Sequence, residues 1–406
     1  MPQDQSGTMM KFVAFLMSLL HSCYLANGIL DPVDFLALQA IRKSLVDLPG
    51  SHFFDSWDFT SDPCSFAGVH CAGGDRVIAL NLGDPKADSP GLTGHLHPDI
   101  AELSGLTEFT VVPGKIYGPL PESLSALKHL RFLGISRNFI SGEIPACLGQ
   151  LKELRTLDLG FNQLSGAIPS AVAALPALST VILNHNRLSG SVPVFVSGSL
   201  TRFDVRHNDL SGTLPPDAFP QSLQFLSLSW NRLSGPVDRI LTGLTNLNYL
   251  DLSMNRFNGG IPGSIFNFPI TNLQLQRNNF SGRVTPAGHV TIPTVDLSYN
   301  HLYGEISPLF STVQNLYINN NRFTGEVPVV FVDRLLSASI QLLYLQHNFL
   351  TGIQINPAAD IPATTSLCLL YNCMVPPIET TCPEKAGKQK SRPTNQCTLW
   401  EGETGN

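Results

Sequence analysis

Charged side chains are scarce in this sequence. Lys, Arg, Asp and Glu together make up 14% of the 406 residues, and the formal net charge is −6. A chain with so few basic residues has no positive field that would draw in nucleic acid or another polyanion over a distance. We therefore expect no nucleic-acid partner, and any contact with an anionic polymer has to be local.

Long apolar runs are also missing. The run at residues 12–20 is shorter than the roughly 20 residues needed to cross a bilayer. It follows Lys11 and precedes the small residues Ala26 and Gly28, which is the pattern of a secretory signal peptide. We expect residues 1–28 to be removed on export. The mature chain is predicted to be secreted to the extracellular space or cell wall, with neither a membrane span nor a lipid anchor.

Recognised catalytic signatures are absent as well. The sequence has no Gly-x-Ser-x-Gly turn, no phosphate-binding Gly-x4-Gly-Lys-Ser/Thr loop and no His-Glu-x-x-His zinc motif. His95 and His97 are interpreted as exposed polar residues, not as metal ligands. Four aspartates share one position of the repeats described below, which favours a framework and solubility role over paired glycosidase carboxylates. They are Asp158, Asp204, Asp251 and Asp296. We expect no enzymatic activity, no metal site and no cofactor.

What the sequence does have is turn residues, with 33 Gly and 30 Pro, and strong self-similarity. The segment Leu-Asp-Leu-Gly-Phe-Asn-Gln-Leu-Ser-Gly-Ala-Ile-Pro at 157–169 recurs along the chain. Its asparagine recurs as Asn138, Asn162, Asn186, Asn208, Asn231, Asn255, Asn278, Asn300, Asn321 and Asn348. The intervals of 21 to 27 residues fall in the leucine-rich-repeat range. Two earlier units carry Gly114 and Pro90 instead, which gives about twelve units over residues 77–355.

Each position of the repeat has a physical reason. Leu157 and Leu159 alternate along a short strand, so both face a shared core, where each is stabilised by roughly 1.5–3 kcal/mol relative to exposure. The amide of Asn162 can pair backbone groups where the chain leaves the strand. Gly166 permits a tight turn and Pro169 stiffens the exit. Because one unit cannot bury its apolar face alone, the units must stack, and each end needs a cap.

The cysteines flank the array. Cys23 leaves with the signal peptide, and Cys64 and Cys71 form a pair because no other cysteine is near them in sequence. The C-terminal four allow three pairings, which the sequence does not distinguish. These four are Cys368, Cys373, Cys382 and Cys397. Cys147 remains, and we expect it to be buried and free.

The N-terminal segment resembles the cap of plant leucine-rich-repeat proteins, with Trp57 and the run Cys64-Ser-Phe-Ala-Gly-Val-His-Cys71. The Leu-x-Gly-x-Ile-Pro signature of the repeats is similar to the same class, which includes receptor ectodomains, polygalacturonase inhibitors and leucine-rich-repeat extensins. The resemblance covers residues 31–355. It implies an α/β repeat fold, a right-handed leucine-rich-repeat solenoid with a concave parallel β-sheet and disulfide-bonded caps. The implied domains are a cap at 29–76, repeats at 77–355 and a Cys-containing cap with a polar tail at 356–406.

Three features depart from that class. The first repeat carries extra residues at 83–90, and no kinase sequence follows the array. The C-terminal segment is longer than the cap of the inhibitors and contains four basic residues. They are Lys385, Lys388, Lys390 and Arg392. We interpret this segment as a solvated, disulfide-tethered lid, with a small basic patch for wall pectin as the alternative.

Residues six, four, two and one before each asparagine are expected to face solvent on the concave side. Aromatic, arginine and histidine side chains gather there on consecutive repeats, and such residues are enriched at binding hot spots. They are Phe161, His185, Arg202, Arg206, His207, Phe225, Trp230, Tyr249, Met254, Arg277, Tyr299, Tyr317 and Tyr344. Trp230, between His207 and Met254, is the predicted centre of a binding patch.

The sequence therefore predicts a secreted, non-catalytic module that binds a protein or peptide on its concave face, in plant cell-wall signalling or defence. A membrane co-receptor and a wall polysaccharide are further candidate partners. The alternatives are a structural wall protein held by pectin and an inhibitor of a wall-degrading enzyme. Asn279-Phe-Ser281 is a glycosylation motif, whose glycan would mark one edge of the concave face.

Overall fold

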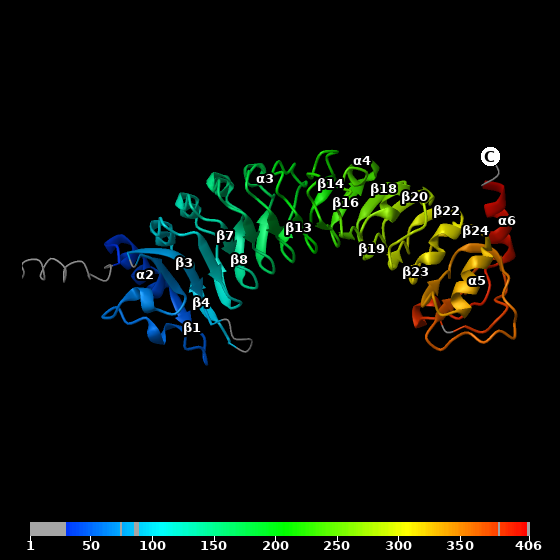
Figure 1. Cartoon of the computed structure of the whole chain (residues 1–406), viewed down its shortest axis with the longest axis horizontal. Helices are drawn as coiled ribbons and strands as arrows, with labels where there is room; N and C mark the ends of the chain where they lie inside the picture. Colours follow the sequence, from blue (N-terminus) through cyan, green and yellow to red (C-terminus); the bar gives the residue numbers. More distant parts are fainter. Residues whose placement is uncertain (1–29, 74, 85–88, 381, 404–406) are drawn as a thin grey trace, which may run out of the picture.

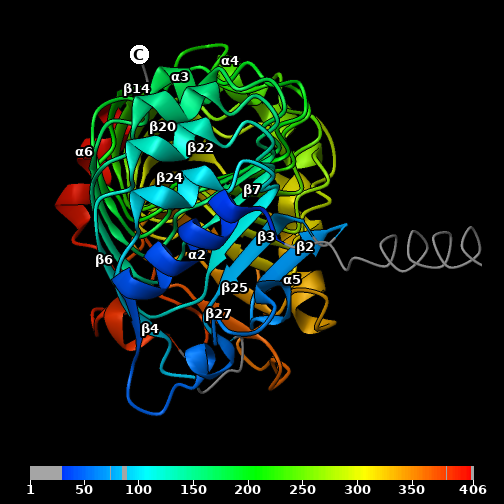
Figure 2. The same cartoon turned by 90° about the vertical axis from the view of Figure 1, so that its left-hand side faces the viewer.

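The computed structural model describes residues 30–73, 75–84, 89–380 and 382–403. The predicted signal peptide at 1–28 lies outside these residues. The described chain forms an arc of stacked units, with strands lining the concave side and short helices along the convex side (Figure 1). Viewed along the arc from the N-terminal end, the coils lie one behind the next (Figure 2).

The concave side carries a 14-stranded sheet that runs the length of the arc. Its first strand, β2 (Val69–Ala72), is antiparallel to β3, and the following strands are parallel to one another. Those strands are β3 (Arg76–Leu82), β5 (Glu108–Val111), β7 (Phe132–Gly134), β9 (Thr156–Asp158), β11 (Thr180–Ile182), β13 (Arg202–Asp204), β15 (Phe225–Ser227), β17 (Tyr249–Asp251), β19 (Asn272–Gln274), β21 (Thr294–Asp296), β23 (Asn315–Tyr317), β25 (Leu342–Tyr344) and β27 (Ser366–Cys368).

A second layer of strands follows the turn after each asparagine and divides into two sheets. The six-stranded sheet contains β1 (Leu45–Asp47), β4 (Leu92–His95), β6 (Lys115–Gly118), β8 (Phe139–Glu143), β10 (Gln163–Gly166) and β12 (Arg187–Leu188). The seven-stranded sheet contains β14 (Ser211–Thr213), β16 (Arg232–Gly235), β18 (Arg256–Gly259), β20 (Asn279–Arg283), β22 (His301–Glu305), β24 (Arg322–Val327) and β26 (Phe349–Ile353).

Helical segments are short and complete the coils. The α-helices are α2 (Pro32–Ser44), α3 (Ser170–Ala173), α4 (Asp238–Leu241), α5 (Val329–Leu336) and α6 (Thr394–Glu403). The 3-10 helices are η1 (Phe53–Ser56), η2 (Pro63–Ser65), η3 (Pro98–Glu102), η4 (Glu122–Ala126), η5 (Ala146–Gln150), η6 (Gly263–Asn267), η7 (Pro308–Thr312) and η8 (Glu384–Ala386). The α3 and α4 helices lie on the convex side (Figure 1).

The repeat positions have the roles that their chemistry predicts. Leu157 and Leu159 are fully buried in one continuous core. The side chain of Asn186 donates to the carbonyls of Leu159 and Leu183, at 3.0 and 3.1 Å, and its oxygen accepts from the amide of Leu164 at 2.9 Å. Each asparagine therefore joins its own repeat to the preceding one, and the set forms a ladder through the stack.

The ladder continues past residue 355, into the segment that the sequence analysis assigned to the cap. The side chain of Asn372 is fully buried, donates to the carbonyls of Leu345 and Leu369, and accepts from the amide of Leu350. Strand β27 pairs with β25 in parallel. The stack thus gains one more unit, and the C-terminal cap begins after it.

The N-terminal cap is joined to the first repeat by buried polar contacts. The carboxylate of Asp34 on α2 accepts from Arg76 Nη2 at 2.8 Å and from the amide of Val77 at 2.8 Å. This carboxylate raises the pKa of Arg76 above its usual value. A disulfide joins Cys64 to Cys71, as the sequence predicts. Together these contacts hold the cap over the apolar end of the stack.

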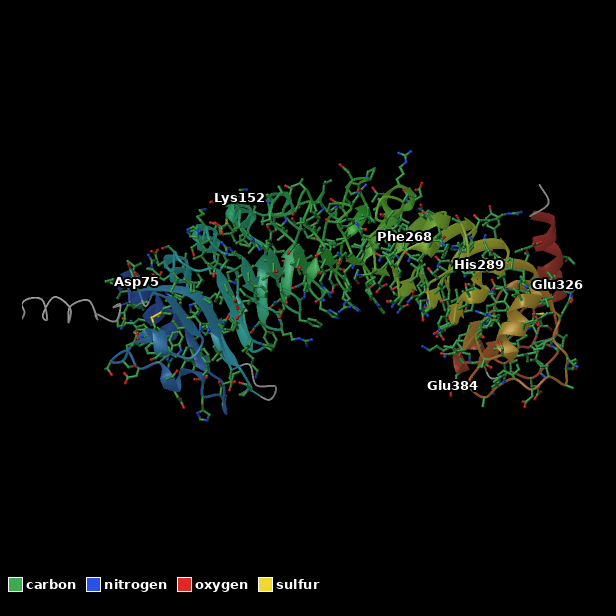
Figure 3. All side chains as sticks on the ribbon, in the orientation of Figure 1. Asp75, Lys152, Phe268, His289, Glu326 and Glu384 are labelled. Atoms are coloured by element: carbon green, nitrogen blue, oxygen red, sulfur yellow. A yellow bond between two sulfur atoms is a disulfide. The ribbon has the colours of Figure 1, made fainter. Side chains whose placement is uncertain are left out.

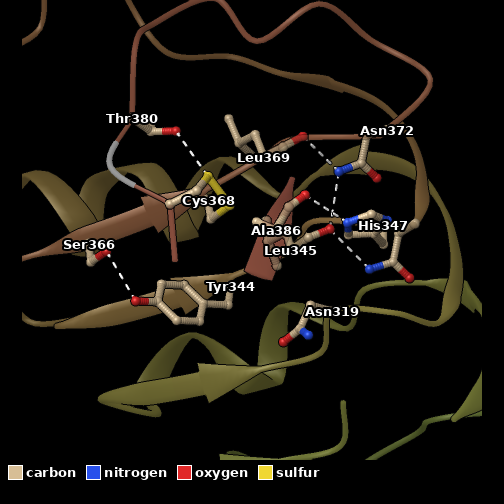
Figure 4. The surroundings of a disulfide bond; sticks show 12 residues. Asn319, Tyr344, Leu345, His347, Ser366, Cys368, Leu369, Asn372, Thr380 and Ala386 are labelled. Atoms are coloured by element: carbon tan, nitrogen blue, oxygen red, sulfur yellow. Dashed lines mark hydrogen bonds between the residues drawn. A yellow bond between two sulfur atoms is a disulfide. The ribbon is translucent and has the colours of Figure 1, made fainter. Parts of the chain in front are cut away.

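The C-terminal cap contains two disulfides, Cys368–Cys382 and Cys373–Cys397, which answer the question of pairing that the sequence left open. Figure 4 shows the first of these bonds beside the last strands of the concave sheet. Of the described cysteines, Cys147 alone forms no disulfide, and its thiol is partly exposed on η5. The expectation of a buried thiol is therefore wrong, because η5 lies at the surface of the coil.

Candidate functional site

The side chains that precede the ladder asparagines stack into a column along one edge of the concave sheet. The guanidinium of Arg137 lies 4.4 Å from the ring centre of Phe161. The Phe161 and His185 rings stack at 4.1 Å, the rings of His185 and His207 at 4.3 Å, and those of His207 and Trp230 at 5.0 Å. We call these five residues the edge column. The edge column begins at the guanidinium of Arg137, continues through the stacked rings and ends at the exposed indole of Trp230.

A backbone constraint aligns the edge column. His185, His207 and Trp230 have φ values of 52°, 54° and 54°, in the left-handed region that few residues other than glycine adopt. The following asparagine fixes this turn by bonding the backbone of its own repeat and of the preceding one, as Asn208 does with the carbonyl of Val205 and the amide of Leu188. The repeats that carry this asparagine therefore project the preceding side chain in the same direction, so that neighbouring rings meet.

A second column lies on the strands, six positions before the asparagines. The guanidinium of Arg202 lies 3.7 Å from the ring centre of Phe225, which stacks on Tyr249 at 4.2 Å with only 5° between the planes. Burial raises the pKa of Tyr249, so this phenol stays neutral at physiological pH. The two columns are parallel because both follow the stacking direction of the repeats.

Aspartates lie between the columns and are shielded from solvent. Asp204 is completely buried, within 4.0 Å of Arg202 and 3.8 Å of Arg206, and accepts from the amide nitrogen of Asn184 at 2.9 Å. Asp251 is 6% exposed and accepts from the backbone amide and the hydroxyl of Ser253. The expected framework role fits these contacts. The expected solubility role is wrong for these two aspartates, because neighbouring side chains cover both carboxylates.

Burial shifts the ionisation of other groups on this face. It raises the pKa of Asp158 and of Asp296 above the ordinary aspartate range. It lowers the pKa of His185, with the charges of His207 and Arg206 adding to the effect, and lowers that of His207 in the same way beside Arg206. Both imidazoles are therefore held neutral more strongly than in free solution.

Two hollows meet at Trp230, whose side chain is 50% exposed. The larger, of about 670 Å³, is lined by residues of the concave sheet that include Arg206, Met254 and Arg277. The smaller, of about 390 Å³, shares Trp230, Met254 and Arg277 with it and is otherwise lined by ladder asparagines and Arg232. Trp230 thus forms a ridge between two concave surfaces, which is a suitable position for an apolar anchor.

The remaining predicted residues lie further along the arc. Arg277 places its guanidinium 4.1 Å from the ring centre of Tyr299. Tyr317 and Tyr344 pack edge to face at 5.3 Å, near the C-terminal end of the sheet. Phe161 belongs to the edge column but does not line either hollow. The structure therefore gathers the predicted residues into a central group around Trp230 and a separate tyrosine group near the cap.

Several residues of this face were missed by sequence reasoning. Arg137 and His347 occupy the same position before an asparagine as Trp230, so the repeat frame alone could have indicated them. Lys385 lines the larger hollow although it belongs to the C-terminal cap. No sequence pattern indicates this position, because it depends on how the cap folds back against the arc.

Asn279 lies at the start of β20, immediately after the ladder residue Asn278, and its side chain is exposed. The next residue, Phe280, is fully buried. The acceptor nitrogen of the predicted glycosylation motif is therefore accessible on one edge of the arc, two residues from Arg277.

Family models match the two parts of the chain that the architecture distinguishes. The leucine rich repeat N-terminal domain matches residues 31–72, and leucine rich repeat models match 128–188, 222–244 and 246–268. The chain is a leucine-rich-repeat protein. In the part of this leucine-rich-repeat protein that the structure describes, no helix is both long and apolar enough to cross a membrane.

Curated relatives of this leucine-rich-repeat protein are plant receptor-like proteins and receptor-like kinases. Receptor-like kinase TMK4 of Arabidopsis thaliana is 35% identical over 301 residues, which is 71% of this chain and 31% of that protein. Receptor like protein 22 of the same plant is 33% identical over 143 residues, which is 34% of this chain and 18% of that protein. The chain thus spans less than a third of the length of these two relatives. That they are receptor-like proteins is consistent with an extracellular location of this chain.

Several solved structures share the fold. The peptide hormone receptor RGFR1, solved in complex with RGF2, has a TM-score of 0.59 and 28% identity, covering 64% of this chain and 43% of the receptor. A TDR receptor has a TM-score of 0.56 and 30% identity, covering 64% and 46%. A plant ice-binding protein has a TM-score of 0.56 and 26% identity, covering 83% of this chain and 99% of that protein.

Proposed function

We propose that this protein is a secreted, non-catalytic recognition module of the plant cell wall, which binds a peptide or protein partner in signalling or defence. The observation that carries the proposal is the exposed indole of Trp230, held at the end of the edge column and flanked by two hollows. An aromatic anchor that is fixed before binding loses little conformational entropy on binding.

The likeness to RGFR1, whose solved complex contains RGF2, supports a peptide as the partner. The contacts of the carboxylates favour recognition over hydrolysis. Asp204 and Asp251 are covered, and both accept hydrogen bonds, Asp204 from Asn184 of the preceding repeat and Asp251 from Ser253 of its own repeat, as expected for groups that maintain the shape of the sheet. Among the described residues, no group of three or more His, Cys, Asp and Glu side chains is arranged to hold a metal ion.

The alternative of a pectin-held wall protein relied on the basic residues of the cap. Arg392 is not free for such a role, because its guanidinium packs at 4.0 Å from the ring centre of Phe349 and its Nε donates to the carbonyl of Asn348. Lys390 lies 3.6 Å from the carboxylate of Glu379, so among the described residues of this basic group only Lys385 and Lys388 remain without such a contact. We therefore propose the concave face, and not the tail, as the site of recognition.

The test compares three immobilised proteins in extracellular fluid from the source tissue. They are the wild type, the concave variant R206A/W230A, and a control variant, R187A/Y117A, that likewise removes one arginine and one aromatic residue, from exposed positions on β12 and β6. Retained polypeptides are quantified by mass spectrometry, and circular dichroism checks that each variant folds. We expect a polypeptide that the wild type and the control retain and the concave variant loses. Equal retention by all three proteins overturns the proposal.

A further inference from the structure

The C-terminal cap folds back over the concave face. Nε2 of His347 donates to the carbonyl of Ala386 at 2.9 Å (Figure 4). The amide of Tyr371 donates to the carbonyl of Lys390 at 3.0 Å. The Cys368–Cys382 disulfide ties the same loop to the last strand of the sheet. In Figure 3 the neighbouring Glu384 lies at the part of the C-terminal region that faces the hollow of the arc. This loop therefore has a defined position at the C-terminal end of the concave face.

The same loop contributes a charged residue to the larger hollow. Lys385 lines it together with Trp230, Met254 and Arg277, although more than a hundred residues separate it from them in sequence. The hollow is consequently bounded by the concave sheet on one side and by the cap on the other. A ligand in contact with the indole of Trp230 also lies within reach of the ammonium group of Lys385.

Positive charge dominates this hollow in a protein whose net charge is −6. It is lined by Arg206, Arg277 and Lys385 against the single carboxylate of Asp251, which already accepts two hydrogen bonds from Ser253. Within the described residues, no carboxylate lies within 4.0 Å of Arg277 or Lys385, whereas Arg206 lies near Asp204. Two cations are thus available to an incoming anionic group.

The hollow also offers unpaired hydrogen-bonding groups. Among the described residues, Oε1 of Gln276 and Nδ1 of His185 are buried without a hydrogen-bond partner, and both side chains line the hollow. Buried polar atoms are normally paired, so each favours a ligand that brings polar groups of its own. The backbone of an extended peptide supplies amides at regular intervals, which match such a surface.

We propose that this hollow receives an acidic side chain of the peptide partner, next to an apolar residue that packs on Trp230, and that Lys385 of the cap and Arg277 of the array hold the carboxylate together. The proposal rests on the proposed function, because it specifies the ligand of the same face. It makes the C-terminal cap part of the binding site.

The probe is a display library of random twelve-residue linear peptides, selected against the immobilised full-length protein. Five proteins are compared: the wild type, Trp230→Ala, Lys385→Gln, the charge reversal Lys385→Glu, and Lys388→Gln as a matched control from the same loop. Lys388 is exposed and does not line the hollow. The measured quantities are the frequency of Asp and Glu in the enriched peptides and their affinity for each protein.

We expect the wild type and Lys388→Gln to enrich acidic peptides that Trp230→Ala no longer binds. Lys385→Gln should weaken the binding of these peptides about two- to fivefold, the size of effect typical of solvent-exposed ion pairs. Lys385→Glu should abolish the acidic preference, because the hollow is then lined by two guanidinium groups and two carboxylates. Enriched peptides that need Trp230 but show no acidic preference overturn this inference and leave the proposed function standing. Failure to enrich any peptide that depends on Trp230 contradicts both.

Discussion

The imidazole of His207 lies nearly parallel to the indole of Trp230, with 5.0 Å between ring centres and 17° between planes. On its other face the same imidazole stacks on His185, at 4.3 Å. Trp230 is therefore exposed and yet supported, because the rings beneath it limit the rotamers that its side chain can adopt. The support depends on two imidazoles lying face to face, a geometry that tolerates neutral rings better than charged ones.

That stack makes the stability of the protein depend on pH. Burial and the charge of Arg206 lower the pKa of His185 and of His207, and Arg137 adds to the effect on His185, while Asp204 opposes it in both. The unfolded chain, with an ordinary histidine pKa of about 6.5, then binds more protons than the folded protein just below that pH. Folding stability consequently falls as the pH drops below about 6.5.

We expect the melting temperature of the double variant H185N/H207N to fall less than that of the wild type between pH 7.5 and pH 5. Differential scanning fluorimetry at several pH values measures this difference. Asp158 and Asp296, whose pKa values are raised, bind more protons in the folded state and act in the opposite direction. They are present in both proteins and cancel in the comparison. An equal loss in both proteins would show that the stacked histidines do not cause the dependence.

Because the ladder asparagines pair buried backbone groups, we expect the replacement of a single one to reduce stability strongly. Asn208 bonds the carbonyls of Leu183 and Val205 at 3.0 Å each and the amide of Leu188 at 2.9 Å. Replacing Asn208 with Ala leaves these buried groups unpaired, at about 1–3 kcal/mol for each group without a new partner. We expect N208A to lower the free energy of unfolding by about 3 kcal/mol or more.

Urea unfolding followed by circular dichroism measures the effect. The matched control is N246A, because Asn246 makes one exposed hydrogen bond, to the carbonyl of Gln221 at 2.9 Å. The control should change stability by less than about 1 kcal/mol. If the two variants unfold at the same urea concentration, the ladder does not contribute as described.

The sequence predicts the ladder and the core because both rest on local chemistry that repeats. Leu157 must face inward, and Asn162 must pair the turn, whatever lies elsewhere in the chain. The burial of Asp204 was not predictable in this way, because Arg202 and Arg206 cover it through their side-chain conformations. The position of Lys385 depends on the pairing of four cysteines and on the curvature of the whole stack, neither of which has a local signal.

We expect that removing a disulfide of the C-terminal cap loosens the cap locally and leaves the repeats intact. Cys368 and Cys382 close a loop with a separation of 14 residues, and a bond of that span contributes about 3 kcal/mol in the chain-entropy treatment. We expect C368S/C382S to speed hydrogen exchange of the amides at 383–391, the segment that contains Ala386. Hydrogen exchange with mass spectrometry measures the rates. The variant C64S/C71S should leave this segment unchanged, and equal protection of 383–391 in all three proteins would contradict the prediction.

Glycosylation of Asn279 is the last prediction, and the structure provides its control. Asn258 on β18 pairs directly with Asn279 on β20, and both side chains are exposed, but only Asn279 is followed by a serine two residues later. Expressed through a secretory pathway, the wild type and N258Q should carry a glycan that an N-glycosidase removes, whereas N279Q should migrate at the deglycosylated position from the start. Equal mobility of the wild type and N279Q would show that the motif is unused.

A glycan at Asn279 would also limit how a partner approaches. Because Asn279 lies two residues after Arg277, the sugar would project from the edge of the arc beside the smaller hollow, which Arg277 and Met254 line. The larger hollow is bounded on its other side by Lys385. A partner would then enter from the open concave side, so peptides selected on N279Q and on the glycosylated wild type should share their contacts with Trp230 and differ in those with the smaller hollow.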